Sequence, residues 1–198
     1  MLNLYYFEPM KSGKKLILFS LLALCLLAGA FGVWNFHRHS QKQEPSFLPE
    51  KITIKGDTTC VSNTTAALNL LKKKSPESYQ EVERYIGIIE CVTAGSGMYP
   101  NETPPRFAVG NETRDAGTIW YAGAIVHDSN HSKLYNQYAL AHPGQQVPPE
   151  VWTGKQAESE CIDVQYKALQ DIGADAATLQ YLKSTINSNY WEQQNRYW

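Results

Sequence analysis

The residues best suited to chemistry lie together in the segment Ala124-Ile-Val-His-Asp-Ser-Asn-His131. His127 and His131 are four positions apart, so on a helix both imidazoles project from one face, about one turn from each other. Two imidazoles in this arrangement can ligate a metal ion, and the carboxylate of Asp128, directly after the first histidine, can act as a general base. The alternative interpretation is a buried histidine pair that hydrogen-bonds to neighbouring carboxylates.

A catalytic zinc site needs a third protein ligand and an open fourth position for water. Glu158 lies 31 residues after His127, beyond a loop long enough to reverse the chain. It heads a mainly apolar helical stripe, and a carboxylate on such an inward face needs a partner, because an unpaired buried charge is costly. A metal held by two histidines would be that partner. An exposed glutamate that favours the helix dipole is the alternative, and Glu160 and Asp163 remain further candidate ligands.

Most of the chain from residue 51 onward has helical periodicity. The spacing of apolar residues predicts helices over 64–74, 75–89, 118–138, 155–172 and 175–187, with Gly173 as the C-cap of the fourth. Strands are expected at 51–55 and 106–109, and the Pro- and Gly-rich segment 142–154 is expected to be a loop. The predicted fold class is therefore α+β, mainly helical.

Three short segments carry a resemblance to a known family. They are Ile125-Val-His-Asp-Ser-Asn-His-Ser132, Trp152-Thr-Gly154 and Ala157-Glu-Ser-Glu-Cys161. In this order they resemble the core of a gluzincin-type metallopeptidase, in which an HExxH helix pairs with a downstream helix that carries a glutamate. The resemblance covers residues 118–172 and implies a compact zincin-like domain.

The resemblance also implies roles for four residues. His127 and His131 would be zinc ligands, Glu158 the third ligand and Asp128 the general base. The chain departs from the family pattern at the base, where it has Asp instead of Glu. Aspartate is one methylene shorter than glutamate, so its carboxylate reaches less far towards the attacking water.

These residues favour a zinc-dependent hydrolase, a peptidase of the cell envelope that acts on a peptide or protein substrate. A hypothesis from a different class is a non-catalytic envelope binding domain with a structural or vestigial metal site. Convergence of His127, His131 and Glu158 on one point is the observation that would support a metal site.

The N-terminal part has the composition of a membrane span. Residues 16–34 have no formal charge, and 19 helical residues extend about 28 Å, close to the thickness of the bilayer core. The preceding lysines favour a cytoplasmic N-terminus. We therefore expect a short cytoplasmic N-terminus (1–15), a transmembrane signal anchor (16–36), a linker (37–50) and a periplasmic or extracellular domain (51–198). Secretion after signal cleavage near Ala30 is the alternative.

The charge distribution excludes some partners. The chain has 18 basic and 19 acidic residues, for a net charge of −1. Residues 40–198 alone have 14 basic and 18 acidic groups, so this part carries −4. Without a basic excess or a Gly-rich phosphate-binding loop, we expect neither a nucleic acid nor a nucleotide as ligand.

The predicted exported domain contains Cys60, Cys91 and Cys161. An oxidising compartment permits disulfides, and an odd number of cysteines leaves one thiol unpaired within the chain. We predict the pair Cys60–Cys91, although the sequence alone does not determine the connectivity.

Overall fold

The computed structural model describes residues 51–186 of the 198-residue chain. The predicted N-terminus (1–15), signal anchor (16–36) and linker (37–50) lie outside the described residues, as does the segment 187–198. Within 51–186, no helix has the length and apolar character needed to cross a membrane. These residues have the predicted fold class, a mainly helical α+β arrangement with a small sheet.

Four short strands form one sheet in the described part of the chain. They are β1 (Thr53–Lys55), β2 (Ile88–Val92), β3 (Gly97–Tyr99) and β4 (Arg106–Gly110). Their order is β1-β2-β4-β3; β1, β2 and β4 are parallel, and β3 runs antiparallel to β4 at one edge. Phe107 on β4 lies opposite both Met98 on β3 and Ile89 on β2, and all three side chains are buried. They form the inner face of the sheet.

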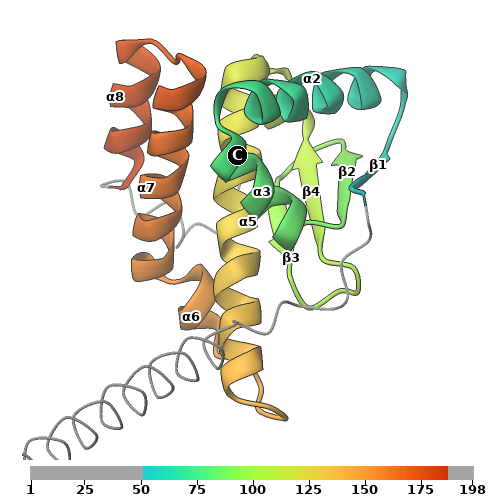
Figure 1. The fold of residues 1–198 in the computed structure, drawn as a ribbon, viewed down its shortest axis with the longest axis vertical. Helices are drawn as coiled ribbons and strands as arrows, with labels where there is room; N and C mark the ends of the chain where they lie inside the picture. Colours follow the sequence, from blue (N-terminus) through green and yellow to red (C-terminus); the bar gives the residue numbers. More distant parts are fainter. Residues whose placement is uncertain (1–50, 187–198) are drawn as a thin grey trace, which may run out of the picture. The chain divides into compact units, whose positions relative to one another are not determined.

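One long helix runs between the sheet and a second helical layer. The helices of residues 51–186 are α2 (Thr58–Lys74), α3 (Pro76–Tyr85), α4 (Asn111–Asp115), α5 (Thr118–Ala141), α6 (Pro149–Thr153), α7 (Lys155–Ile172) and α8 (Ala176–Thr185). In Figure 1, α5 stands in the middle, with the sheet on one side and α7 and α8 on the other. Helices α2 and α3 also pack against α5. Side chains on α5 can therefore meet residues from every other layer.

Local signals determine where several helices begin and end. Asp57 caps α2, because its carboxylate accepts a hydrogen bond from the backbone N–H of Cys60 at 2.8 Å. Asp175 caps α8 in the same way through the N–H of Thr178, also at 2.8 Å. Gly173 ends α7 in the left-handed conformation, with φ of 91°, which confirms the predicted C-cap.

Several segments differ from the sequence-based expectation, among them the end of the second helix and the expected loop 142–154. The second helix ends at Tyr85 and is followed by β2, because Gly87 weakens the helix and the isoleucines at 88 and 89 favour a strand. The expected loop 142–154 contains α6. Pro149 can begin this short helix, since the first helical position needs no N–H donor.

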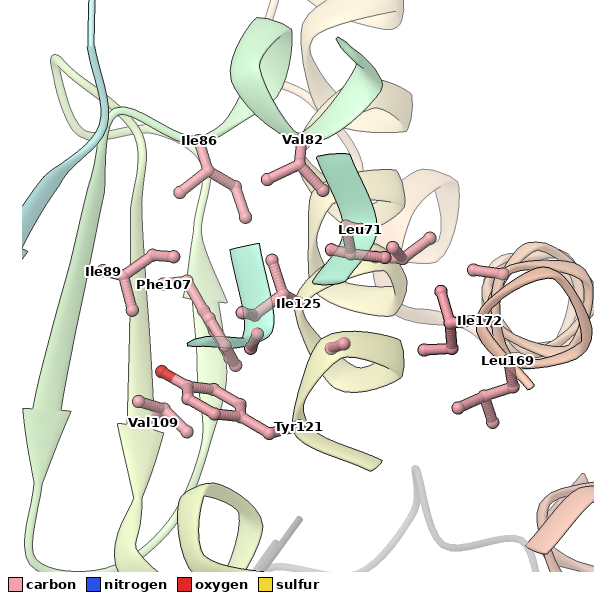
Figure 2. Packing of buried hydrophobic residues seen from close by; sticks show 14 of the residues in the cluster. Leu71, Val82, Ile86, Ile89, Phe107, Val109, Tyr121, Ile125, Leu169 and Ile172 are labelled. Carbon is pink, nitrogen blue, oxygen red and sulfur yellow. The ribbon is translucent and has the colours of Figure 1, made fainter. Parts of the chain in front are cut away.

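The hydrophobic core surrounds α5 (Figure 2). Ile89 and Phe107 project from the sheet towards Ile125 on α5. Tyr121, also on α5, is fully buried, and its hydroxyl lies 2.8 Å from the hydroxyl of Thr64 on α2. Burial raises the pKa of Tyr121 to about 12, so the phenol stays neutral and its polar atom has a partner. The core thus fixes α5 along its N-terminal half.

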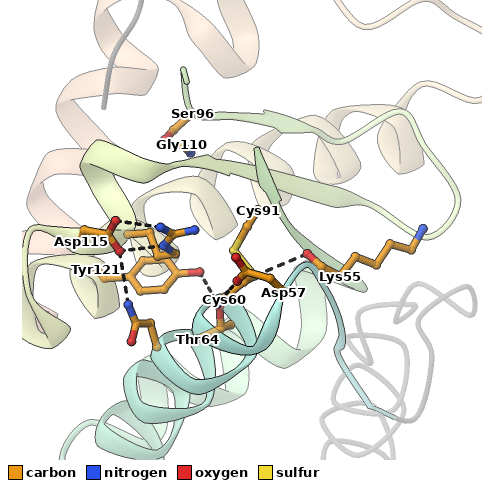
Figure 3. Close-up of a disulfide and its surroundings, with 11 residues drawn as sticks. Lys55, Asp57, Cys60, Thr64, Cys91, Ser96, Gly110, Asp115 and Tyr121 are labelled. Atoms are coloured by element: carbon orange, nitrogen blue, oxygen red, sulfur yellow. Dashed lines mark hydrogen bonds and ion pairs between the residues drawn. A yellow bond between two sulfur atoms is a disulfide. The ribbon is translucent and has the colours of Figure 1, made fainter. Parts of the chain in front are cut away.

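A disulfide joins the first turn of α2 to β2 (Figure 3). It links Cys60 to Cys91, which confirms the predicted pair, and Cys161 is free and buried. Gly56 lies next to the disulfide and has φ of +153°. A Cβ atom there would lie 2.5 Å from the Cys60 sulfur, so only glycine fits this position without displacement.

Replacing both bridged cysteines, Cys60→Ser with Cys91→Ser, is expected to lower the free energy of unfolding by roughly 3–4 kcal/mol. The bridge spans 31 residues of sequence and restricts the unfolded chain over that length. Urea unfolding of the full chain measures the change, and reduced wild type should match the double variant. Equal stability of the oxidised wild type and the variant would show that the bridge contributes nothing.

Candidate metal centre

Helix α5 presents both histidines from the interior of the domain. Residues 121–132 are buried without interruption. A helix that is enclosed on all sides is typical of a protein interior. His127, Asp128 and His131 are accordingly only 8%, 8% and 7% exposed. Buried polar side chains require partners, and neighbouring elements supply them for His127 and His131.

The structure brings His127, His131 and Glu158 together. The two Nε2 atoms are 3.0 Å apart. Oε2 of Glu158, on the antiparallel helix α7, lies 3.3 Å from Nε2 of His127 and 3.5 Å from Nε2 of His131. Glu158 is 1% exposed, so the inward position that the helical stripe predicted is correct. Whether the three residues ligate a metal stays a prediction.

The size of this triangle can be compared with a zinc site. A circle through the three atoms has a radius of about 1.9 Å, so a point about 2.05 Å from all of them lies about 0.8 Å outside their plane. Zn–N and Zn–O bonds are about 2.0–2.2 Å long, and a regular tetrahedron with such bonds places the metal about 0.7 Å from the plane of three ligands. The spacing of the three atoms therefore fits three corners of a tetrahedral site.

Each imidazole has a second partner at its other nitrogen. Nδ1 of His127 lies 3.0 Å from Oε1 of Gln165 on α7. Nδ1 of His131 lies 2.5 Å from the backbone oxygen of Trp152 on α6. A carbonyl can only accept a hydrogen bond, so Nδ1 of His131 must carry a proton. Outer partners of this kind orient metal-binding histidines in proteins.

The protonation states follow from burial and from these contacts. Burial opposes ionisation of Glu158, but its contacts with His127 and His131 outweigh this effect and hold the pKa of the carboxyl well below its usual range. Burial would lower the pKa of His131, yet its contacts with Cys161 and Glu158 raise that pKa well above the ordinary value. Because burial raises the pKa of the Cys161 thiol, the charge that stabilises protonated His131 is that of Glu158.

Cys161 completes a buried cluster that can hold a metal ion. The sulfur of Cys161 and one nitrogen each of His127 and His131 all lie within 4.8 Å of one another. The thiol is fully buried, and Nδ2 of Asn130 lies 3.5 Å from its sulfur. From the sequence, Cys161 is a core thiol or half of a disulfide, and Glu158 is preferred to it as a metal ligand. The position of Cys161 three residues after Glu158, on the same face of α7, places the thiol beside the site.

A small pocket of about 140 Å³ opens onto the two histidines. Asp128 and Glu158 contribute to its wall, and Cys161 does not. The other lining residues come from β3 with its preceding turn and from the end of α6: Ser96, Gly97, Met98, Trp152 and Thr153. The carboxylate predicted to be a general base is therefore in the same pocket as the histidines.

The further candidate ligands, Glu160 and Asp163, lie elsewhere. Both line a separate pocket of about 300 Å³ between α3, α5 and α7, which contains neither histidine. Glu160 accepts a hydrogen bond from Nδ2 of Asn130 at 3.3 Å. The structure therefore leaves Glu158 and Cys161 as the two candidates for a third ligand.

Gly123 sets the separation of α5 and α7 beside the site. A Cβ atom at this position would lie 2.8 Å from Cδ2 of Leu169 and 3.3 Å from Cγ of Gln165. Real Cβ atoms almost never come within 3.0 Å of another heavy atom, so a side chain here would displace the Leu169 side chain or push α7 away. Gly123 is one helical turn before His127, which places the closest approach of the helices next to the histidine contacts.

Comparison of the chain with protein-family models, curated proteins and solved structures gives no match. The resemblance of residues 118–172 to gluzincin-type peptidases therefore stays a prediction. The finding that stands is the buried cluster of His127, His131 and Cys161, which can hold a metal ion.

The change Gly123→Ala is expected to destabilise the protein by about 1–3 kcal/mol, because the added methyl group overpacks the contact with Leu169. Leu169→Ala creates a cavity at the same place, so the double variant should be more stable than the sum of the two single changes predicts. Urea unfolding of all four proteins measures this coupling. Gly97→Ala is a matched control, since a Cβ there meets nothing within 4 Å. Strictly additive effects would contradict the proposed contact.

Proposed function

We propose that this protein is a zinc-dependent hydrolase that cleaves peptide bonds. His127, His131 and Glu158 hold the metal, and Asp128 is the general base. The observation that carries the proposal is the triangle of two Nε2 atoms and one carboxylate oxygen, with edges of 3.0, 3.3 and 3.5 Å. Two nitrogens and one carboxylate oxygen, with one position left open, are a ligand set that catalytic zinc sites use.

The donor set suits zinc by charge and by chemistry. Imidazole and carboxylate together are borderline ligands, and one carboxylate against a divalent cation leaves a net positive centre. Zinc in such a site supplies Lewis acidity, which makes water a nucleophile near neutral pH. The low pKa of Glu158 means that this ligand is already ionised when a metal arrives.

Asp128 has the position that a base requires. It follows His127 on α5, and its side chain lines the pocket that contains the histidines and Glu158. A carboxylate there can accept a proton from a water molecule in the pocket and return it to the leaving amine. Its side chain is one methylene shorter than that of glutamate.

The edge of the sheet is the feature that favours a peptide as the substrate. Gly97 and Met98 on β3 line the same pocket, and β3 is an edge strand. Within residues 51–186, no other strand pairs with its outer side. An extended peptide can add to such an edge through main-chain hydrogen bonds. A substrate bound in this way would pass the mouth of the pocket beside Asp128.

We further propose that the domain is exported and attached to the membrane through residues 16–36. The support is the uncharged apolar run behind three lysines, together with the Cys60–Cys91 disulfide, because stable disulfides form in oxidising compartments. The domain would then act in the periplasm or outside the cell. Secretion after cleavage near Ala30 is the alternative.

A second candidate function is a binding domain that uses a metal only for structure. Cys161 favours it, because thiolate and two imidazoles are also zinc ligands. If Cys161 and Glu158 both coordinated, four protein ligands would close the site and leave no position for water. The two functions therefore differ in whether Cys161 is a ligand.

Zinc binding by single variants of the full-length protein separates these candidates. We expect one zinc per chain in wild type and a loss of affinity of more than about 100-fold in His127→Ala and Glu158→Gln, since both remove a direct ligand. Cys161→Ser should keep its zinc. His142→Ala is the control, because its imidazole hydrogen-bonds to and stacks on Tyr138 and does not line the pocket of the site.

Competition with a chromophoric chelator gives the affinities, and mass spectrometry of the metal gives the content. Loss of zinc in Cys161→Ser together with its retention in Glu158→Gln would overturn the assignment of Glu158. A thiolate-to-cobalt charge-transfer band in the cobalt-loaded wild type would identify Cys161 as a ligand directly. Absence of zinc binding in wild type would refute the proposed function.

Peptide cleavage tests the role of Asp128. Zinc-loaded wild type is expected to cleave members of a mixed peptide library, and Asp128→Asn should be about 10²–10⁴-fold slower while keeping its zinc, because it loses the general base. Liquid chromatography with mass spectrometry detects the products. Asp163→Asn is the matched control on α7, outside the pocket. Equal rates for Asp128→Asn and wild type would exclude Asp128 as the base.

A further inference from the structure

Two side chains of α7 hold His127 from opposite sides of its ring. Glu158 contacts Nε2 at 3.3 Å, and Gln165, seven positions further along the helix, contacts Nδ1 at 3.0 Å. Gln165 is 4% exposed, which is unusual for a glutamine and indicates that its amide has a defined partner. His127 is the partner that the structure gives this amide oxygen.

The orientation of this amide decides which nitrogen of His127 is available. Neutral imidazole carries one proton, on Nδ1 or on Nε2. If the amide oxygen faces the ring, it accepts from Nδ1–H and leaves the lone pair on Nε2. If the amide nitrogen faced the ring, Nδ1 would be the acceptor and Nε2 would carry the proton. Only the first arrangement lets Nε2 ligate a metal.

The contact of Nδ1 with the amide oxygen favours the first arrangement. Nδ1 of His127 lies 3.0 Å from Oε1 of Gln165, which can only accept a hydrogen bond, so this contact requires a proton on Nδ1. Nδ1 of His131 faces the carbonyl of Trp152 and carries a proton for the same reason. The two Nε2 atoms, 3.0 Å apart, are then the nitrogens nearest to Glu158.

We propose that Gln165 is a positioning residue, which fixes the Nδ1-protonated form of His127 and so prepares Nε2 for the metal. This inference rests on the proposed function, because the prepared Nε2 atom has a role only if His127 binds a metal. A neutral amide orients the ring without adding a second negative charge next to Glu158, so the bound cation keeps its net positive charge. A carboxylate in this place would orient the ring equally well but would cancel that charge.

Gln165 could instead serve only as packing, because its Cγ lies near Gly123 at the helix contact. Three variants of the full chain separate the two roles. Gln165→Met keeps the length of the side chain and removes the acceptor. Gln165→Glu keeps an acceptor and cannot donate. Asn136→Leu is the matched control, since it removes a buried amide of α5 whose Nδ2 donates to the backbone and side-chain oxygens of Ser132.

The first measurement is the tautomer of His127 in the metal-free, ¹⁵N-histidine-labelled protein, read from long-range ¹H–¹⁵N correlations. We expect a proton on Nδ1 in wild type, in Gln165→Glu and in Asn136→Leu, and a shift of the proton towards Nε2 in Gln165→Met. A proton on Nε2 of His127 in wild type would overturn the proposal, and this measurement needs no folded variant.

The second measurement is zinc affinity. Gln165→Met should bind zinc about 10–100-fold more weakly than wild type, as is typical when an outer partner of a ligand is lost. Gln165→Glu should bind at least as tightly as wild type. Unchanged affinity in Gln165→Met, or a loss in Gln165→Glu equal to that in Gln165→Met, would overturn the proposal. If wild type binds no zinc, the proposed function fails, and the tautomer still decides the role of Gln165.

Discussion

The close packing of α5 on α7 at Gly123 is the constraint on which the candidate site depends. The helices are antiparallel, so residues that follow Gly123 on α5 face residues that precede Leu169 on α7. His127 therefore meets Gln165 one turn further on, and both histidines meet Glu158 beyond it. A wider separation would lengthen every one of these contacts, because hydrogen bonds weaken steeply with distance. The absence of a side chain at one position thus determines the spacing of the polar groups.

The buried polar groups of the site also depend on one another. Glu158 is almost completely enclosed, and an isolated carboxylate there would be strongly destabilising. Its charge is balanced by the imidazoles, whose own orientation depends on neutral partners, an amide at Gln165 and a backbone carbonyl at Trp152. The loop that ends in α6 is therefore part of the site through its backbone. Such a network tolerates loss of a member poorly, since each remaining group would be left buried without a partner.

A repeating apolar pattern in the sequence predicted helices well. Features that depend on a single contact could not be predicted. Apolar periodicity predicted α5 and α7 nearly to their ends, and it placed Glu158 on the buried face of α7. It could not identify Trp152 as a partner, because a backbone carbonyl has no residue-specific signal. Gln165 stood in the predicted stripe, but a glutamine in a stripe does not reveal which atom it will contact. The short helix α6 and strand β3 were not predicted. Helix α6 has five residues and β3 has three, which is too short for an apolar period to appear.

The direction of the fourth coordination position would distinguish a catalytic metal site from a structural one. Glu158 and Asp128 line the pocket, whereas Cys161 lies on the enclosed side of the histidines. The oxygen of Glu158 is 3.3 and 3.5 Å from the two Nε2 atoms, distances that match ligands on one tetrahedral metal. A metal held by the three atoms would lie beside the pocket that Asp128 also lines. If the metal instead lay closer to the Cys161 sulfur, its open coordination position would be buried. Asp128 could then not act on a substrate bound there. Under the proposed function, the pocket that Asp128 shares with the histidines and Glu158 would admit the substrate, whereas a closed structural site would need no such access.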